Sequence, residues 1–359
     1  MAAPPKNTRS VETRIRIVVF HQGALGDFLM AASAIDELAG YPAGVRVDFW
    51  SKPEHVSLLT GKSYLGECYS SDGALGAELL QDSLWRTTDL PDFLIEADHV
   101  FVFGQAGSLI MAERLSARLS ANVRWIQSFP AAKDTRTHVS KFLSRQFNAL
   151  GWPIAGKIFH LSPPVSEQQA ARDFLLGLGI CSRPICIHPG SGGAHKVWPL
   201  RNWHGLFHWI RRESSFQAFL SIGPADERID EFSGAMREAG IPIVSGLSPL
   251  RLSALLSLCS LFVGSDSGVS HLAAAVGIPT LAVFGPSDPR VWAPRGRNVL
   301  ALRRDWKEGD VFKWAPSEKP EFQDEEIAGI LTQVDRGQSR TRRVKPGSAR
   351  VNHPAGVIG

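Results

Sequence analysis

The sequence predicts an α/β protein with two doubly wound domains, each a parallel sheet covered by helices on both faces. Short β-branched apolar runs alternate with helical patterns along most of the 359 residues. The alternation stops at residues 151–168, a stretch with three prolines and little periodicity, and then starts again. A chain of this length is long for one domain and ordinary for two. We therefore place the domains at residues 14–155 and 166–305.

The first domain begins with residues 15–20, an apolar run that is too short for a helix and is soon followed by Gly23. A helical pattern then runs from Asp27 to about Leu38. The pattern predicts further strands at residues 45–50, 98–103 and 123–126, and further helices at 109–119 and 138–150.

The second domain repeats this order, and a C-terminal extension at residues 306–335 ends in a predicted helix at 325–334. Ligands of such sheets bind at the carboxyl ends of the strands, so we expect the loops of both domains to face one inter-domain cleft. The predicted strands are residues 185–188, 218–222, 241–244, 261–263 and 280–284, and the predicted helices are 203–212, 227–239, 250–259 and 271–276.

The composition indicates a soluble globular protein of a reducing, cytoplasmic compartment. Hydrophobic residues make up 44% and charged residues 21% of the chain. The four cysteines, Cys68, Cys181, Cys186 and Cys259, form no CxxC pair and no ligand-spaced set with histidine, which argues against a structural zinc site. No segment reaches the roughly 18 apolar residues of a membrane span. The first ten residues lack the apolar core of a secretory signal.

The basic charge is concentrated at the C-terminus. The formal net charge is +4, but residues 336–359 hold six Lys/Arg and no acid, and the rest of the chain carries −2. The body is therefore near neutral, and we expect no nucleic-acid partner. We interpret residues 336–359 as a disordered, solvated tail. Contact of this tail with an anionic membrane surface is the alternative interpretation.

Loop one, residues 21–27, directly follows the first strand and reads GxxGD. Gly23 and Gly26 allow a tight strand-to-helix turn, and Asp48 lies where a ribose-binding acid of a dinucleotide site would lie. A carboxylate at Asp27 would repel a pyrophosphate docked at the helix start, whereas it suits a general base that faces a hydroxyl. The alternative is that Asp27 only complements the helix dipole.

Loop two, residues 188–199, follows the first strand of the second domain. Glycines such as Gly190 let backbone N–H groups approach an anion, Ser191 adds a hydroxyl, and Lys196 adds a flexible positive charge. The P-loop pattern GxxxxGK[ST] is absent. We interpret loop two as a phosphate-binding loop, with a flexible surface loop as the alternative.

Loop three, residues 264–277, also follows a strand and opens a helix. Ser267 and Gly268 place small residues at the helix N-terminus, where free N–H groups bind anions. His271, one turn later, can direct an imidazole N–H at the same anion, although a structural histidine is the alternative. Asp266 is unusual for a bare phosphate site and can instead hold the loop by accepting hydrogen bonds.

Loops two and three together predict a site for a nucleotide diphosphate. The chain contains no DxD motif, so Lys196, His271 and the helix dipole must neutralise the diphosphate without a metal. Asp27 would face this site from the other domain. A leaving group held by one domain and a base held by the other is the arrangement that inverting glycosyl transfer requires.

The three loops resemble those of glycosyltransferase family 9, the ADP-heptose:lipopolysaccharide heptosyltransferases, over about residues 14–305. The resemblance implies a GT-B fold of two Rossmann-like domains, an inverting mechanism, and no metal or cofactor. It implies that Asp27 is the catalytic base and that the donor is held by Ser191, Lys196, Asp266, Ser267, Gly268 and His271. Asp226 or Glu227 would bind the ribose, less securely. Ser33 departs from the family pattern, which usually has proline there.

These observations predict a transferase that moves a heptose from an ADP-activated donor to a lipopolysaccharide-core or related glycan acceptor, reached at the cytosolic face of the inner membrane. A transferase of the same family for another sugar or acceptor is one alternative. An NAD-dependent oxidoreductase that uses Asp48 is a second, and a catalytically silent sugar-nucleotide-binding module is a third.

Overall fold

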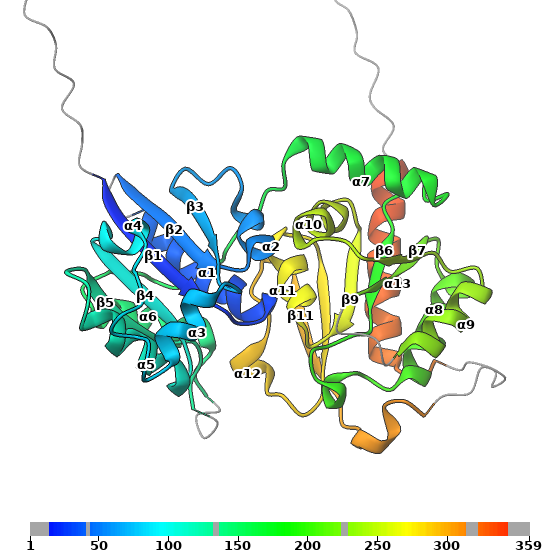
Figure 1. Ribbon diagram of the computed structural model, residues 1–359. Coiled ribbons are helices and arrows are strands. Elements are labelled where there is room, and N and C mark those ends of the chain that lie inside the picture. The colour runs from blue at the N-terminus through cyan, green and yellow to red at the C-terminus, as the bar shows by residue number, and fades with distance from the viewer. Residues whose placement is uncertain (1–13, 41–43, 132–135, 224–228, 314–321, 344–359) are drawn as a thin grey trace, which may run out of the picture.

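The computed structural model describes residues 14–40, 44–131, 136–223, 229–313 and 322–343, which form two α/β units side by side (Figure 1). The first sheet has the strand order β3-β2-β1-β4-β5 and the second β11-β10-β9-β6-β7-β8. All paired strands are parallel. The predicted fold class, two doubly wound parallel sheets, is therefore confirmed.

The N-terminal unit places helices on both faces of its sheet. Its strands are β1 (Ile15–His21), β2 (Val45–Ser51), β3 (Leu65–Ser70), β4 (His99–Gly104) and β5 (Asn122–Gln127). Its helices are α1 (Leu25–Ala39), α2 (Pro53–Val56), the 3₁₀ turn η1 (Ser57–Leu59), α3 (Ala74–Leu80), α4 (Asp92–Ile95), α5 (Ala106–Ser116) and α6 (Val139–Ala149). Alternate residues of β1 face opposite layers: Val18 packs towards α5, and Ile17 packs towards α1 and α6.

The C-terminal unit has the same layered construction. Its strands are β6 (Ile185–His188), β7 (Ala218–Ile222), β8 (Ile243–Ser245), β9 (Leu261–Ser265), β10 (Thr280–Phe284) and β11 (Val299–Arg303). Its helices are α7 (Val165–Gly177), α8 (Leu200–Glu213), α9 (Asp230–Glu238), α10 (Pro249–Ser257), α11 (Gly268–Ala275), α12 (Pro289–Trp292) and α13 (Glu325–Arg343), with 3₁₀ turns η2 (Ala194–Lys196) and η4 (Glu308–Asp310). Ile327 and Leu331 of α13 are buried against the same layer as α8.

Several elements were not expected from the sequence, and one is longer than expected. The unexpected elements include the short helices α2, α3, α4 and α12, whose four to seven residues are too few to show a helical period. The 13-residue helix α7 begins inside the stretch predicted as a linker, because Pro163 and Pro164 and a mixed polar sequence concealed its pattern. Strands β3 and β11 lie at sheet edges, where little of the strand is buried, and β3 also has a weak apolar signal. Helix α13 continues to Arg343, so the first eight residues of the tail that we predicted to be disordered are helical. Residues 344–359 lie outside the described residues.

The connection between the units is attached to both of them. The backbone N–H groups of Ala155 (2.8 Å) and Lys157 donate to the carboxylate of Glu37 on α1. Ser33, the departure from the family pattern, donates from Oγ to the Lys157 carbonyl at 3.2 Å. Further along, the Leu161 N–H donates to Ala275 at the end of α11 at 2.9 Å. The polar side chains of α1 therefore hold the linker in place.

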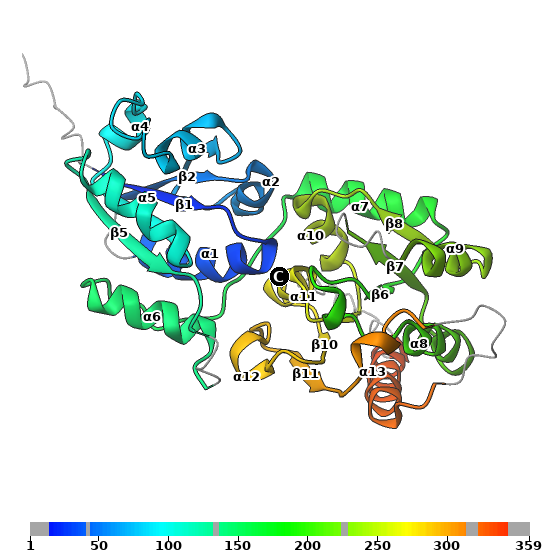
Figure 2. The same ribbon diagram turned by 60° about the horizontal axis from the view of Figure 1, so that its bottom comes forward.

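One apolar core crosses between the units. It joins residues of α1 such as Phe28 and Ile35 with residues of α10 and α11 such as Leu255 and Leu272. Figure 2 shows the start of α1 directed at α11. The carboxyl end of β1 and the carboxyl end of β9 consequently meet at the seam between the two units.

Candidate functional site

Asp27 lies in the first turn of α1, immediately after β1, as predicted. Gly23 is needed in the preceding turn, because a Cβ there would lie 2.9 Å from Cε1 of His21. Burial raises the pKa of the Asp27 carboxyl above its usual range, and the Asp266 carboxylate raises it further. A hydrogen bond from the Ala24 backbone and the charge of Lys196 lower it in part. Asp27 is thus a carboxylate of increased basicity at the seam.

This raised pKa predicts that the Asp27 carboxylate costs the protein stability at neutral pH. The folded state binds the proton more tightly than the unfolded state, so stability falls as the pH rises from about the usual value of 3.8 through the folded pKa. We expect Asp27→Asn to have a higher melting temperature than the wild type at pH 7.5, with a difference that shrinks towards pH 4.5. A lower melting temperature at pH 7.5 would show that attraction to Lys196 outweighs burial.

Lys196 and Asp266 form an ion pair that joins loops two and three. The Lys196 Nζ lies 3.0 Å from Asp266 Oδ2, and the Asp266 side chain is only 6% exposed. The hydroxyl of Ser287 donates to the same carboxylate oxygen. Ser191 donates from Oγ to the Asp266 backbone carbonyl at 2.6 Å, so here it holds the two loops together. Its contact with a donor phosphate stays a prediction.

The start of α11 lies directly against the start of α1. A Cβ on Gly268 would lie 2.9 Å from the Gly26 nitrogen, and one on Gly26 would lie 3.4 Å from the Gly268 Cα. The Gly268 position therefore requires glycine for this close approach of two backbones, whereas a Cβ at Gly26 would be at contact distance. The Ser267 hydroxyl lies 3.5 Å from Ser270 Oγ rather than on a backbone N–H, which leaves the helix N-terminus suited to an anion.

His271 is placed at this junction but is neutral at neutral pH. Burial lowers the pKa of its imidazole; the charges of His138 and Lys196 also lower it. Asp266 and a hydrogen bond to the Trp292 backbone raise it only in part. A neutral imidazole has a single N–H, and His271 directs it at the Trp292 backbone. The N–H to a donor phosphate that we predicted from the sequence therefore requires protonation of the ring or loss of this hydrogen bond.

The family model described as glycosyltransferase family 9 (heptosyltransferase) matches residues 111–320, more than half of the chain. The chain belongs to glycosyltransferase family 9. The matched segment contains loops two and three, whereas Asp27 precedes it.

Curated relatives of the chain match over shorter segments. "Lipopolysaccharide heptosyltransferase 3" of Escherichia coli K12 is 28% identical over 127 residues, which are 34% of this chain and 37% of the relative. "Lipopolysaccharide heptosyltransferase 1" of Pseudomonas aeruginosa is 29% identical over 146 residues, which are 40% of each chain. The chain thus spans about two fifths of the length of these relatives.

Solved structures of this family share the fold over nearly their whole length. E. coli ADP-heptose lipopolysaccharide heptosyltransferase II has a TM-score of 0.62 at 18% identity and covers 89% of this chain and 99% of its own. The family 9 glycosyltransferase of Veillonella parvula has a TM-score of 0.66 at 16% identity, with coverages of 89% and 96%. The predicted GT-B architecture is therefore confirmed.

Asp226 and Glu227 lie outside the described residues, so their ribose contact stays a prediction. Gly190 is buried within loop two. Asp48 lies in the middle of β2, where its carboxylate accepts from Glu67 N–H at 2.7 Å and from Arg46 Nε at 3.0 Å. An acid that is already bound in this way does not favour the dinucleotide interpretation.

Other residues at the junction were not anticipated from the sequence. The Trp292 ring lies 6.0 Å from Lys196 Nζ and 5.1 Å from the Phe129 ring of the N-terminal unit. Trp306 donates from Nε1 to the His195 carbonyl of loop two at 3.1 Å. Trp292 ends the four-residue helix α12, and Trp306 lies in an irregular segment, so neither belongs to an element long enough to show a periodic sequence signal.

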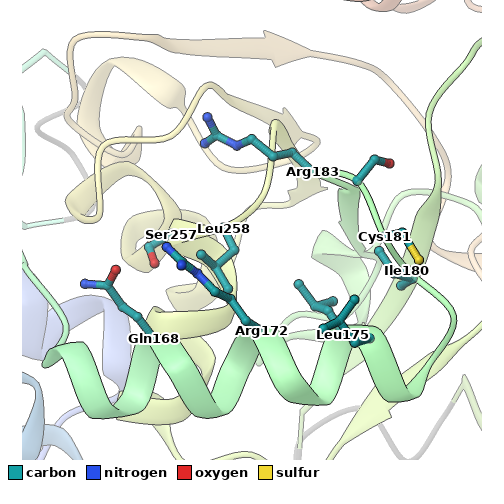
Figure 3. Close-up of a pocket in the computed structure, with 10 residues that line it drawn as sticks. Gln168, Arg172, Leu175, Ile180, Cys181, Arg183, Ser257 and Leu258 are labelled. Carbon is teal, nitrogen blue, oxygen red and sulfur yellow. The ribbon is translucent and has the colours of Figure 1, made fainter.

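A cavity of about 560 Å³ lies away from this junction, beside α7 (Figure 3). None of the predicted site residues lines it. It is lined by Gln168, Arg172, Leu175, Leu176, Ile180, Cys181, Ser182, Arg183, Ser257 and Leu258.

The described ranges contain neither a candidate metal site nor a candidate membrane span. In those ranges, no three His, Cys, Asp or Glu side chains are grouped so that they could hold a metal ion. Over the same residues, no helix has the length and apolar character needed to cross a membrane.

Proposed function

We propose that this protein is an inverting, metal-independent glycosyltransferase that transfers a heptose from an ADP-activated donor to a lipopolysaccharide-core or related glycan acceptor. The observation that carries the proposal is the direct contact of Gly26 with Gly268. This contact brings Asp27 of one unit within electrostatic reach of Lys196 and Asp266 of the other. Family membership and the heptosyltransferase names of the relatives support the class of sugar.

The proposed reaction uses the two sides of the junction for different tasks. The oxygen of an acceptor hydroxyl attacks the anomeric carbon of the donor, and the bond from that carbon to the diphosphate oxygen breaks. Asp27 takes the hydroxyl proton. The charge that develops on the departing diphosphate is stabilised by the Lys196 ammonium and the N-terminal amides of α11, and by a second N–H of His271 once the diphosphate has caused its ring to be protonated.

Before the donor binds, Lys196 is already paired with Asp266. A diphosphate that binds Lys196 competes with the Asp266 carboxylate for the same ammonium. Asp266 keeps the Ser287 hydroxyl as a partner when this happens, so the buried carboxylate is not left without a hydrogen bond. The donor thus replaces one negative partner of Lys196 with another.

We propose that the acceptor is a glycolipid that the enzyme reaches at the cytosolic face of the inner membrane. The names of solved and curated relatives support this: they include a heptosyltransferase with bound ADP and several lipopolysaccharide heptosyltransferases. A transferase of the same family that uses another sugar or acceptor is the second candidate, because the identities lie below 30%.

A thermal-shift panel with ADP, UDP, GDP, CDP and NAD, followed by a transfer assay in EDTA, tests this proposal. We expect ADP to stabilise the protein most, by about 2.7 kcal/mol at a hundred times its Kd. We also expect transfer from ADP-heptose without added metal, since the chain has no DxD motif. A shift with NAD alone would favour the oxidoreductase. ADP binding without transfer to any tested acceptor would favour a silent binding module.

A further inference from the structure

The segment Trp292, Ala293, Pro294 and Arg295, here called the bridging segment, connects the C-terminal unit to the N-terminal unit at three points. The Trp292 ring meets Phe129 at 5.1 Å. The Ala293 carbonyl lies 2.9 Å from Nε2 of His138, which caps the start of α6. Arg295 donates from Nη1 to Ser140 Oγ at 2.8 Å.

The same segment also contacts the proposed donor site. The Lys196 Nζ lies 6.0 Å from the Trp292 ring, and the His271 ring is hydrogen-bonded to the Trp292 backbone. A displacement of the bridging segment would therefore move neighbours of both donor-binding side chains.

Arg295 extends this connection to the linker and to α1. Its Nη1 also donates to the Gly156 carbonyl. The residues on either side of Gly156, Ala155 and Lys157, donate their N–H groups to Glu37 of α1. Arg295 and Glu37 thus hold the same turn of the linker from opposite units. Glu37 lies on the helix whose first turn carries Asp27.

These contacts limit the rotation of one unit relative to the other. The contact between Gly26 and Gly268 is one close approach of two backbones, and the apolar core that α1 shares with α10 and α11 has no preferred direction, so both tolerate a small rotation of the units. A directional attachment at a distance along the seam opposes such a rotation. The guanidinium of Arg295 supplies it through two acceptors whose positions are fixed by α6 and by the linker.

We propose that Arg295 is a positioning residue: it fixes the orientation of the two units and thereby holds Asp27 opposite Lys196 and His271. The consequence for transfer rests on the proposed function. The effect of Arg295 on the orientation of the units does not depend on that function, and it can be measured without any substrate.

The native cysteines allow a direct measurement of this orientation. Cys68 on β3 and Cys181 beside the cavity of Figure 3 are exposed, one in each unit, whereas Cys186 and Cys259 are buried. A nitroxide reagent should label the two exposed thiols, and pulsed electron spin resonance then reports the distance between the units. The variants are Arg295→Met, Arg295→Lys and, as a matched control, Arg297→Met. Arg297 is exposed on the same loop.

We expect Arg295→Met, which loses the charge-assisted hydrogen bonds to Ser140 and Gly156, to broaden the distance distribution and to lower kcat about tenfold. ADP affinity should stay within about twofold, because neither donor loop is altered. Arg295→Lys should fall between Arg295→Met and the wild type, since an ammonium keeps the charge but not the two-acceptor geometry. Arg297→Met should match the wild type in distance and rate.

Two results would overturn the proposal. One is an unchanged distance distribution in Arg295→Met, whatever happens to the rate. The other is a loss of ADP affinity as large as the loss of kcat, which would place Arg295 in the donor site itself. If Arg295→Met broadens the distances but the wild type transfers no sugar from ADP-heptose, the positioning role of Arg295 stands. In that case the proposed function fails.

Discussion

Asp27→Asn is expected to slow sugar transfer by about 10²–10⁴, the usual cost of removing a general base. Asparagine keeps the size of the side chain but cannot accept the proton of the acceptor hydroxyl. ADP affinity should stay within about twofold, because Asp27 belongs to the N-terminal unit and the donor loops to the other. Steady-state kinetics and calorimetric titration with ADP measure the two quantities.

The pH profile and a control variant complete this test. Because burial raises the pKa of Asp27, kcat/KM should fall as the pH drops through that raised value, and this acid limb should be absent from the residual activity of Asp27→Asn. Asp36 lies on the same helix and pairs with Lys62 at 2.7 Å, so Asp36→Asn should keep full activity. Wild-type turnover in Asp27→Asn would leave Asp27 only the role of complementing the helix dipole.

Lys196→Ala is expected to weaken ADP binding by about 10- to 150-fold, which corresponds to a lost charge-assisted hydrogen bond of roughly 1.5–3 kcal/mol. The loss in kcat/KM should be larger, because the negative charge on the leaving diphosphate grows in the transition state. Calorimetry with ADP and single-turnover transfer with ADP-heptose separate the two effects.

The ion pair with Asp266 adds a second expectation for this variant. Removing Lys196 leaves a nearly buried carboxylate without its cation, so Lys196→Ala should melt at a lower temperature than the wild type. Lys196→Ala/Asp266→Asn should recover part of that loss. Lys313 pairs with Asp310 at the surface, so Lys313→Ala should change neither stability nor affinity appreciably. Unchanged ADP affinity together with unchanged turnover in Lys196→Ala would remove loop two from the site.

The elements that were predicted correctly are those whose burial is visible in their own sequence. Strands β6 and β10 and most of β1 are enclosed on both faces, and all three are largely apolar, with Arg16 near the start of β1 as an exception. Helix α7 and the edge strand β3 were missed because each buries only a few side chains. Helix α13 was expected to end near Val334, but it continues through Gly337 to Arg343.

The sequence by itself determined which loops carry the side chains that we propose as reactive. Asp27, Lys196 and His271 each follow an apolar strand within a glycine- or serine-rich turn, and the carboxyl end of a parallel strand is where such a loop must lie. The types of residue in these loops also indicated their separate tasks, because a carboxylate repels a diphosphate and an ammonium attracts one.

Only the tertiary structure decided how these side chains face one another. The contact of Gly26 with Gly268, the pairing of Lys196 with Asp266 and the hold of Arg295 on Ser140 and Gly156 join segments that are far apart in the chain. A local sequence pattern indicates that a residue is buried or follows a strand. It does not indicate which residues from distant parts of the chain that residue contacts. The packing of one unit on the other sets these contacts. The same packing excludes water from Asp27 and His271 and thereby shifts the pKa of both side chains.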